Sequence, residues 1–145
     1  MFLDASAIVA VCGDEKDAGY FIAKIEMSNK PIFYSSLSMF EAVISLARKK
    51  TISIHGENVS TPPEIIDQVQ AQVEAFVETI GAKELSISGT LHKKAIEVAR
   101  TYGRFVGHPA KLNFGDCFAY ACAQSYRLPL LFKGDDFSKT DIDMA

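Results

Sequence analysis

Acidic side chains follow apolar segments at several separate places in this chain of 145 residues. Asp4 comes after the apolar stub at the N-terminus, and Glu41 lies in the otherwise apolar segment SSLSMFEAVISLA. Asp116 lies in LNFGDCFAYACA, and the pair Asp135 and Asp136 follows LPLLFKG. A carboxylate in such surroundings is unfavourable unless something neutralises it. A divalent metal ion is the simplest candidate, so the acids predict a metal site.

The elements that would position these acids alternate between short apolar segments and helical patterns. Strands are expected at residues 1–3, 32–34, 83–87 and 128–132, and helices at 6–11, 17–28, 36–49, 62–80, 90–102 and 114–126. The polar stretches 51–61 and 103–112 are expected to be loops. This alternation predicts an α/β protein with a parallel sheet, and the absence of a linker predicts a single domain over residues 1–145.

The order of the elements brings the acids together. Binding sites in an open α/β sheet form at the carboxyl ends of the strands. Asp4 follows the first expected strand, and Asp135 and Asp136 follow the last. Glu41 lies one turn into the helix after the second strand, and Asp116 lies in the first turn of the helix before the last strand. Carboxylate oxygens fixed at one edge suit Mg²⁺ or Mn²⁺.

Local signals predict how three of the helices begin. Ser36 is a plausible N-cap for the helix that runs to residue 49. Thr61 and Glu64 match a capping box for the helix 62–80, and Asn113 caps the next helix with Asp116 at its third position. The buried stripe of the helix 36–49 is expected to contain Phe40, Val43, Ile44 and Ala47.

The composition excludes several classes of protein. Apolar residues make up 48% of the chain, which rules out a disordered class, and the net charge of −3 rules out a uniformly basic surface. No apolar run approaches the length of a membrane span, and the N-terminus lacks the pattern of a signal peptide. The cysteines Cys12, Cys117 and Cys122 form no CxxC pair. Unpaired thiols suit a reducing compartment, so a cytoplasmic protein with no membrane association is expected.

The chain resembles the PIN-domain ribonucleases, and specifically the VapC-type toxins of bacterial toxin–antitoxin pairs. The resemblance is carried by FLDASAIVAV, SMFEAVISLARKK, AKLNFGDCFAYACAQ and LPLLFKGDDFSKTDI. It extends nearly end to end and is weakest between residues 51 and 84. The combination of NFGDCFAYA with LLFKGDDF is highly specific. The resemblance implies a three-layer α/β/α PIN-like domain with a short, mainly parallel central sheet.

The resemblance also implies an activity and a set of ligands. The activity is Mg²⁺-dependent hydrolysis of RNA to 5′-phosphate and 3′-hydroxyl ends, with Mn²⁺ as an alternative metal. Asp4, Glu41 and Asp116 would be the core metal ligands. The fourth acid maps onto the GDDF turn, where Asp135 is preferred because it is nearer the strand, and Asp136 is the alternative because it precedes a phenylalanine. The metal would activate a water for in-line attack on the phosphodiester.

Two further groups of residues have a functional and an ordinary explanation. Ser6 either caps a helix or gives a hydrogen bond to a metal ligand or water. Arg104, Lys111 and Lys133, with His108, either form solvated basic loops or position RNA phosphates beside the acids. The run 48–50, Arg-Lys-Lys, is expected to favour a helix end through the helix dipole.

The expected partners are the RNA substrate, a cognate antitoxin and a second copy of the chain in a homodimer. The antitoxin is expected to place an arginine on the acids and to dock on residues 36–50 and 62–80. The amphipathic helix 62–80 has an ordinary alternative, which is to cover the sheet.

Other functions fit the pattern less well. Each acid taken alone could be a helix cap, a first-turn acid or a turn former, and only the joint pattern favours a site. A phosphotransfer enzyme of the haloacid-dehalogenase type needs a second Asp two residues after the first, where this chain has Ser6. A PIN-like module that only binds RNA or protein usually loses one or more of the acids, and none is missing here.

Overall fold

Four short parallel strands form the centre of the molecule. The computed structural model describes every residue, 1–145. The strands are β1 (Phe2–Leu3), β2 (Phe33–Ser35), β3 (Lys83–Leu85) and β4 (Leu130–Leu131), in the sheet order β3-β2-β1-β4. In the register, Phe2 lies opposite Phe33 on one side and Leu130 on the other. The central strand β1 therefore lies between the second strand and the last.

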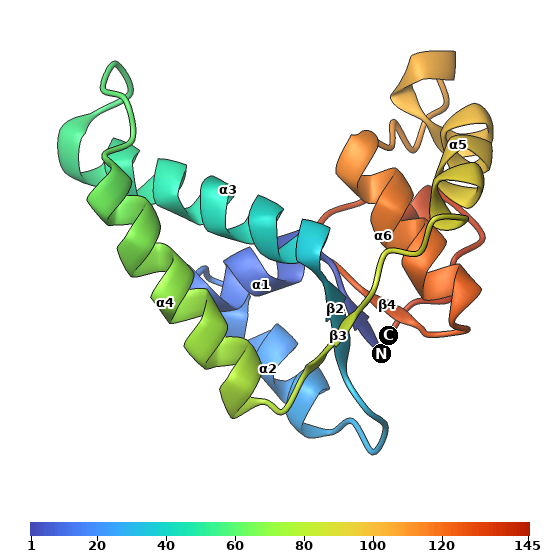
Figure 1. The fold of residues 1–145 in the computed structure, drawn as a ribbon, viewed down its shortest axis with the longest axis horizontal. Helices are drawn as coiled ribbons and strands as arrows, with labels where there is room; N and C mark the ends of the chain where they lie inside the picture. Colours follow the sequence, from blue (N-terminus) through green and yellow to red (C-terminus); the bar gives the residue numbers. More distant parts are fainter.

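Helices cover both faces of this sheet (Figure 1). The helices are α1 (Ala5–Cys12), α2 (Ala18–Glu26), α3 (Ser36–His55), α4 (Pro63–Thr79), α5 (Leu91–Tyr102) and α6 (Phe114–Ser125), with 3₁₀ turns η1 (Arg104–Val106) and η2 (Phe137–Lys139). The first four helices lie on one side of the sheet and α5 and α6 on the other. The expected three-layer α/β/α architecture is confirmed.

The alternation of side chains along the strands creates two hydrophobic cores. Successive residues of a strand point to opposite faces of the sheet. Phe2 and Leu130 accordingly pack with α5 and α6, whereas Leu3 and Leu131 pack with α1 to α4. All four side chains are buried, so even these two-residue strands are fixed by both layers.

Helix α3 is longer than the sequence predicts. The expected loop at residues 51–61 is wrong for its first five residues, since the helix continues to His55 and ends at Gly56 with φ 87°. Thr51 explains the difference, because it is buried and its hydroxyl donates to the carbonyl of Ala47 at 2.9 Å. The polar side chain is thus satisfied inside the helix itself.

The orientation of α3 also differs from the expected one. Val43 and Ala47 are buried as predicted, but Phe40 is 63% exposed and Ile44 is 40% exposed. The buried face instead consists of Ser38, Ala42, Val43, Leu46, Ala47 and Thr51. Phe40 and Ile44 are therefore left free beside the cluster of acids.

The helix starts follow the predicted signals only in part. Asn113 and Asp116 form the predicted capping box of α6. The N-cap of α3 is Ser35 and not Ser36, because the Ser35 side chain accepts the N–H of Ser38 at 3.1 Å. The predicted capping box at Thr61 is absent, since α4 begins after Pro62 without a side-chain cap. In α4, the apolar stripe is buried at Ile65, Val69, Val73 and Val77, so covering the core is its main role.

No helix has both the length and the apolar character needed to cross a membrane. The three cysteines form no disulfide, and Cys117 and Cys122 are buried.

Candidate active site

A pocket of about 470 Å³ lies where β1 ends and α1 begins. Asp4, Glu41 and Asp116 all line it, although 74 residues lie between the second of these acids and the third. The pocket is bounded by α1, α3, the start of α6 and the segment after β4. The structure thus brings together the three acids that the sequence analysis places at one sheet edge.

Asp4 is held by the first turn of α1, for which it is the N-cap. Its Oδ2 accepts the backbone N–H of Ser6 at 2.9 Å and the hydroxyl of the same serine. The side chain is buried, and this burial raises the pKa of Asp4 although both hydrogen bonds from Ser6 oppose the shift. A buried carboxylate of this kind is costly in its charged form unless a cation lies nearby.

Asp116 is held by the first turn of α6. Its Oδ2 accepts the backbone N–H of Asn113 at 2.8 Å, and Asn113 in turn accepts the N–H of Asp116 at 3.0 Å. Burial raises the pKa of Asp116 to about 6, with further increases from the charges of Asp4 and Asp136. The hydrogen bond from Asn113 and the charge of Arg104 act in the opposite direction.

Glu41 differs from the other two acids because no hydrogen bond holds its carboxylate. Burial raises the pKa of Glu41 to about 7, and the charges of Asp4 and Asp116 add to this increase. The carboxylate lies against the backbone of Gly115, where a Cβ atom would overlap it. Glu41 can therefore approach α6 only because residue 115 is a glycine, a role that the sequence analysis did not assign.

The two acids of the GDDF turn differ in their relation to the pocket. Both Asp135 and Asp136 are exposed. The charge of Asp136 raises the pKa of Asp116, whereas Asp135 is not among the groups that act on it. The backbone carbonyl of Asp135 accepts the hydroxyl of Ser138 at 2.6 Å and so stabilises the turn.

Ser6 links two parts of the site. Its hydroxyl donates to Asp4 and accepts the backbone N–H of Lys133 at 2.9 Å. The segment after β4 is thereby tied to the first turn of α1. Ser6 therefore makes a hydrogen bond to one of the acids, as expected of a residue that supports a metal ligand.

The basic residues differ in whether they line the acidic pocket. Lys133 lines the pocket, and Arg104 is close enough for its charge to lower the pKa of Asp116. Lys111 is exposed, has a φ of 51° and does not line the pocket. Lys49 and Glu15 also line the pocket, and the sequence analysis assigned neither of them a place there.

The three acids are of the type that binds a divalent cation, but their oxygens do not all converge on one position. Asp4, Glu41 and Asp116 supply oxygens of the kind that Mg²⁺ and Mn²⁺ prefer. The charges of Asp4 and Asp116 disfavour ionised Glu41, and a cation would relieve that repulsion. No three His, Cys, Asp or Glu side chains form a ready-made metal cluster. Of the three carboxylates, only that of Glu41 has no hydrogen bond from the protein.

Comparison with known proteins identifies the family. Residues 1–143 match the model of the PIN domain family. A VapC ribonuclease of Rhizobium meliloti is 35% identical over 141 residues, which cover 97% of this chain and 98% of the relative. The chain therefore belongs to the PIN domain family and, within it, to the VapC ribonucleases. The expectation of an RNA-cleaving enzyme of this toxin family is confirmed.

Solved structures support the fold. The crystal structure of Mycobacterium tuberculosis VapC20, described as a toxin that cleaves the sarcin–ricin loop, aligns with a TM-score of 0.68 at 13% identity. The alignment covers 99% of this chain and 97% of that one. A toxin–antitoxin complex from Klebsiella pneumoniae aligns with a TM-score of 0.57 at 15% identity and covers 94% and 89% of the two chains.

Proposed function

We propose that the protein is a Mg²⁺-dependent endoribonuclease toxin in which Asp4, Glu41 and Asp116 hold the metal. The observation that carries the proposal is that three carboxylates from distant segments line one pocket and that the charges of two of them raise the pKa of the third. A carboxylate cluster with raised pKa values in a cleft is typical of a functional site. Mn²⁺ is the alternative metal.

Each acid has a distinct part in the proposed reaction. Asp4 and Asp116 are oriented through Oδ2 by hydrogen bonds from Ser6 and Asn113. The carboxylate of Glu41 lines the same pocket without a hydrogen bond from the protein, and it would complete the set of oxygens that hold the metal. When bound, Mg²⁺ supplies a Lewis acid that makes water a better nucleophile and offsets charge on the leaving oxygen.

The fourth acid of the site belongs to the turn after β4. Asp135 is nearer the strand, but Asp136 is the one whose charge reaches Asp116. This observation favours Asp136, with Asp135 as the alternative. Arg104 supports the same end of the site, because its positive charge acts on Asp116 and is available to an RNA phosphate.

The test is to replace Asp4 or Asp116 with Asn and to measure RNA cleavage with Mg²⁺. Asn keeps an oxygen that accepts from Ser6 or Asn113, so the local fold is preserved while the charge is lost. Cleavage is expected to disappear, and the metal-free fold is expected to be as stable or more stable, because a buried like charge is removed. Full cleavage by both variants would exclude these residues from the mechanism.

We also propose an antitoxin as the inhibitory partner. Phe40 and Ile44 of α3 are exposed and line the pocket beside the acids. An antitoxin segment could anchor apolar side chains there while an arginine pairs with the carboxylates in a bidentate manner. The same segment would fold on binding. Hydrogen exchange on adding the cognate partner should protect α3 and the surroundings of Asp4, and protection wholly elsewhere would contradict this mode.

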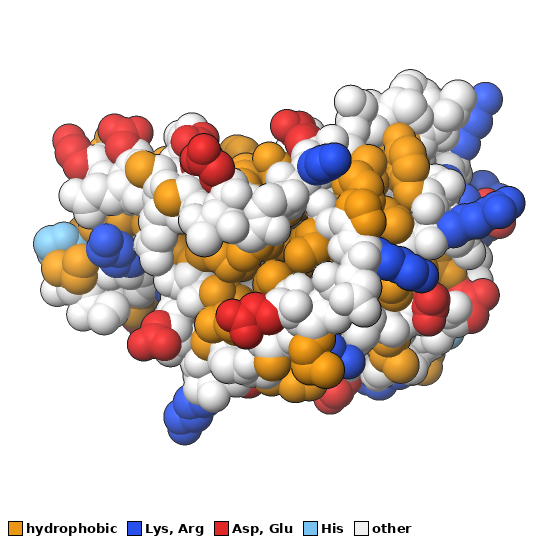
Figure 2. Space-filling model, turned by 90° about the horizontal axis from the view of Figure 1, so that it is seen from below, with side chains coloured by type: hydrophobic (Ala, Val, Ile, Leu, Met, Phe, Trp, Pro, Cys, Tyr) orange, Lys and Arg blue, Asp and Glu red, His pale blue; other side chains and the backbone are white.

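A homodimer is the proposed assembly, in the cytoplasm. Large hydrophobic side chains remain exposed, including Met27, Phe105 and Phe114. Hydrophobic side chains are also exposed across the middle of the face seen in Figure 2. Burying such surface against a second copy would be favourable. Light scattering should give the mass of two chains at micromolar concentration, and a monomer alone would contradict the proposal.

A further inference from the structure

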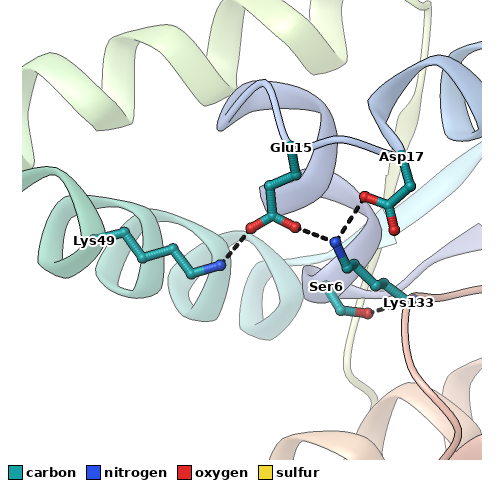
Figure 3. Close-up of polar contacts among 5 residues, drawn as sticks. All are labelled: Ser6, Glu15, Asp17, Lys49 and Lys133. Carbon is teal, nitrogen blue, oxygen red and sulfur yellow. Dashed lines mark hydrogen bonds and ion pairs between the residues drawn. The ribbon is translucent and has the colours of Figure 1, made fainter. Parts of the chain in front are cut away.

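Two lysines from distant segments meet at one carboxylate on the rim of the acidic pocket. Lys49 comes from α3 and Lys133 from the segment after β4, and both point toward Glu15, which follows α1 (Figure 3). The Nζ of Lys49 lies 2.5 Å from Oε1 of Glu15, and the Nζ of Lys133 lies 2.5 Å from Oε2. Lys133 also pairs with Oδ1 of Asp17 at 2.7 Å. Both oxygens of Glu15 are therefore occupied, one by each lysine.

These lysines are the only cationic side chains that line the pocket. The pocket otherwise presents Asp4, Glu41 and Asp116, which repel a polyanion at long range. A lysine ammonium has three N–H donors. Lys49 donates one of them to protein and Lys133 donates two, so both ammonium groups keep donors for a further acceptor. Their side chains are 54% and 37% exposed, which leaves them accessible.

A purely structural explanation accounts poorly for this arrangement. Exposed ion pairs contribute little to stability, because ordering long side chains costs entropy and water screens the charges. Here one carboxylate orders two such side chains at the mouth of the site, and Glu15 itself is only 19% exposed. The pairing lowers the pKa of Glu15, so this carboxylate stays ionised and keeps both lysines in place.

We infer that Lys49 and Lys133 form a clamp for two backbone phosphates of an RNA strand entering the acidic pocket, and that Glu15 is the residue that positions them. The inference rests on the proposed ribonuclease function and assigns the substrate contacts of that site. Phosphate contacts fix the position of a nucleic acid without reading its sequence. The clamp would thus hold the strand at the edge of the pocket while a neighbouring phosphodiester lies at the carboxylates.

The binding experiment uses the Asp4→Asn protein, which is expected not to cleave. A fluorescently labelled single-stranded oligoribonucleotide of mixed sequence is titrated in Mg²⁺ at several salt concentrations. Each lost phosphate contact on a single strand reduces the magnitude of the negative slope of log K against log salt by about 0.7. Adding Lys49→Gln or Lys133→Gln should therefore make the slope less negative by about 0.7 and weaken binding several-fold at low salt. Lys93→Gln, at an exposed lysine of α5 away from the pocket, is the control and should change neither quantity.

The variant Glu15→Gln tests whether Glu15 positions the two lysines or only neutralises their charge. Removal of a negative charge near RNA should tighten binding if Glu15 only neutralises the lysines. If Glu15 positions them, binding should weaken despite the gain in net charge. Tighter binding by Glu15→Gln, or unchanged slopes in both lysine variants, would overturn the inference. Mg²⁺-dependent cleavage by the unaltered chain is measured in parallel, so a failure of the proposed function appears as no cleavage and is distinct from a failure of the clamp.

Discussion

The carboxylate of Glu41 occupies the space that a side chain on Gly115 would fill. Glu41 comes from α3 and Gly115 from the first turn of α6, next to Asp116. Because these two helices approach closely, the carboxylate of Glu41, which has no hydrogen bond, lies near Asp116, the acid of the capping box. The absence of a Cβ at residue 115 is thus a condition for the arrangement of the site.

Gly115→Ala should separate activity from stability. The methyl group would displace the flexible end of Glu41, and a misplacement of about 1 Å at a reacting centre can cost about a hundredfold in rate. Alanine also has a higher helix propensity, so the free energy of unfolding should stay equal or rise by up to about 1 kcal/mol. RNA cleavage and thermal unfolding of the same preparation measure both effects.

The matched control is Gly19→Ala in α2. A Cβ on Gly19 meets no atom within 4 Å, and the residue is exposed. This variant should gain the same propensity and keep full cleavage. Equal cleavage by the two variants would show that the contact between Glu41 and residue 115 has no catalytic importance.

Removing the hydroxyl of Ser6 should weaken the site without unfolding the protein. Ser6→Ala loses the bond to Asp4 and the bond from the N–H of Lys133, while the N–H of residue 6 still donates to Asp4. Loss of a hydrogen bond that orients a ligand typically costs 10-fold to 100-fold in metal affinity or activity. The free energy of unfolding should fall by only about 1 kcal/mol.

Calorimetric titration with Mg²⁺ and cleavage assays check this expectation. Ser6→Thr keeps the hydroxyl and should retain most of the affinity. Ser86→Ala, at an exposed serine with no side-chain hydrogen bond, serves as the control and should behave like the unaltered chain. Unchanged Mg²⁺ affinity in Ser6→Ala would limit this serine to tying the segment after β4 to α1.

The pKa shifts predict how stability depends on pH in chelator. The pKa of Glu41 is raised from 4.5 to about 7 and that of Asp116 from 3.8 to about 6, and the pKa of Asp4 is also raised. The folded state therefore binds these protons more tightly than the unfolded state. Their stabilising contribution is complete below about pH 4 and is lost as the pH rises through about 6 to 7.

Urea unfolding between pH 4 and 8 in chelator tests this direction. Mg²⁺ should restore stability most strongly at the upper end of the range, because the ionised carboxylates bind it and the unfolded chain does not. Asp116→Asn should flatten the pH dependence. Metal-free stability that rises from pH 5 to 7 in the unaltered chain, and not in Asp116→Asn, would contradict the assignment of the shift to this site.

The sequence predicts the central part of the site because that part depends on chain order. Asp4 and Asp116 follow from where the first strand ends and the last helix begins, and the fold places both in one pocket. The parts proposed for Gly115, Glu15 and Lys49 depend on contacts between segments far apart in the sequence. Such contacts leave no local pattern in the sequence. The sequence shows Lys49 only as one of three consecutive basic residues near the predicted end of a helix.

The errors in the fold have the same origin. Polar residues after position 49 predict a loop, but burial of Thr51 against its neighbours keeps the helix intact. The apolar residues Phe40 and Ile44 predict a buried face, but the tertiary arrangement turns them toward the pocket. In both cases packing against another helix overrides the local signal.

The last prediction compares Asp135→Asn with Asp136→Asn. The charge of Asp136 raises the pKa of Asp116, so its removal should lower that pKa and make Asp116 ionise at a lower pH. If Asp136 also contributes to holding the metal, Mg²⁺ affinity and cleavage should fall at neutral pH by 10-fold or more. Asp135→Asn is the matched control from the same turn, and it keeps the backbone carbonyl that accepts from Ser138.

Carbon-detected NMR of the Asp116 carboxyl measures its pKa, and calorimetric titration measures the Mg²⁺ affinity. A larger loss of affinity in Asp135→Asn than in Asp136→Asn would assign the fourth acid to Asp135, and equal affinity in both variants and the unaltered chain would remove the GDDF turn from the metal site.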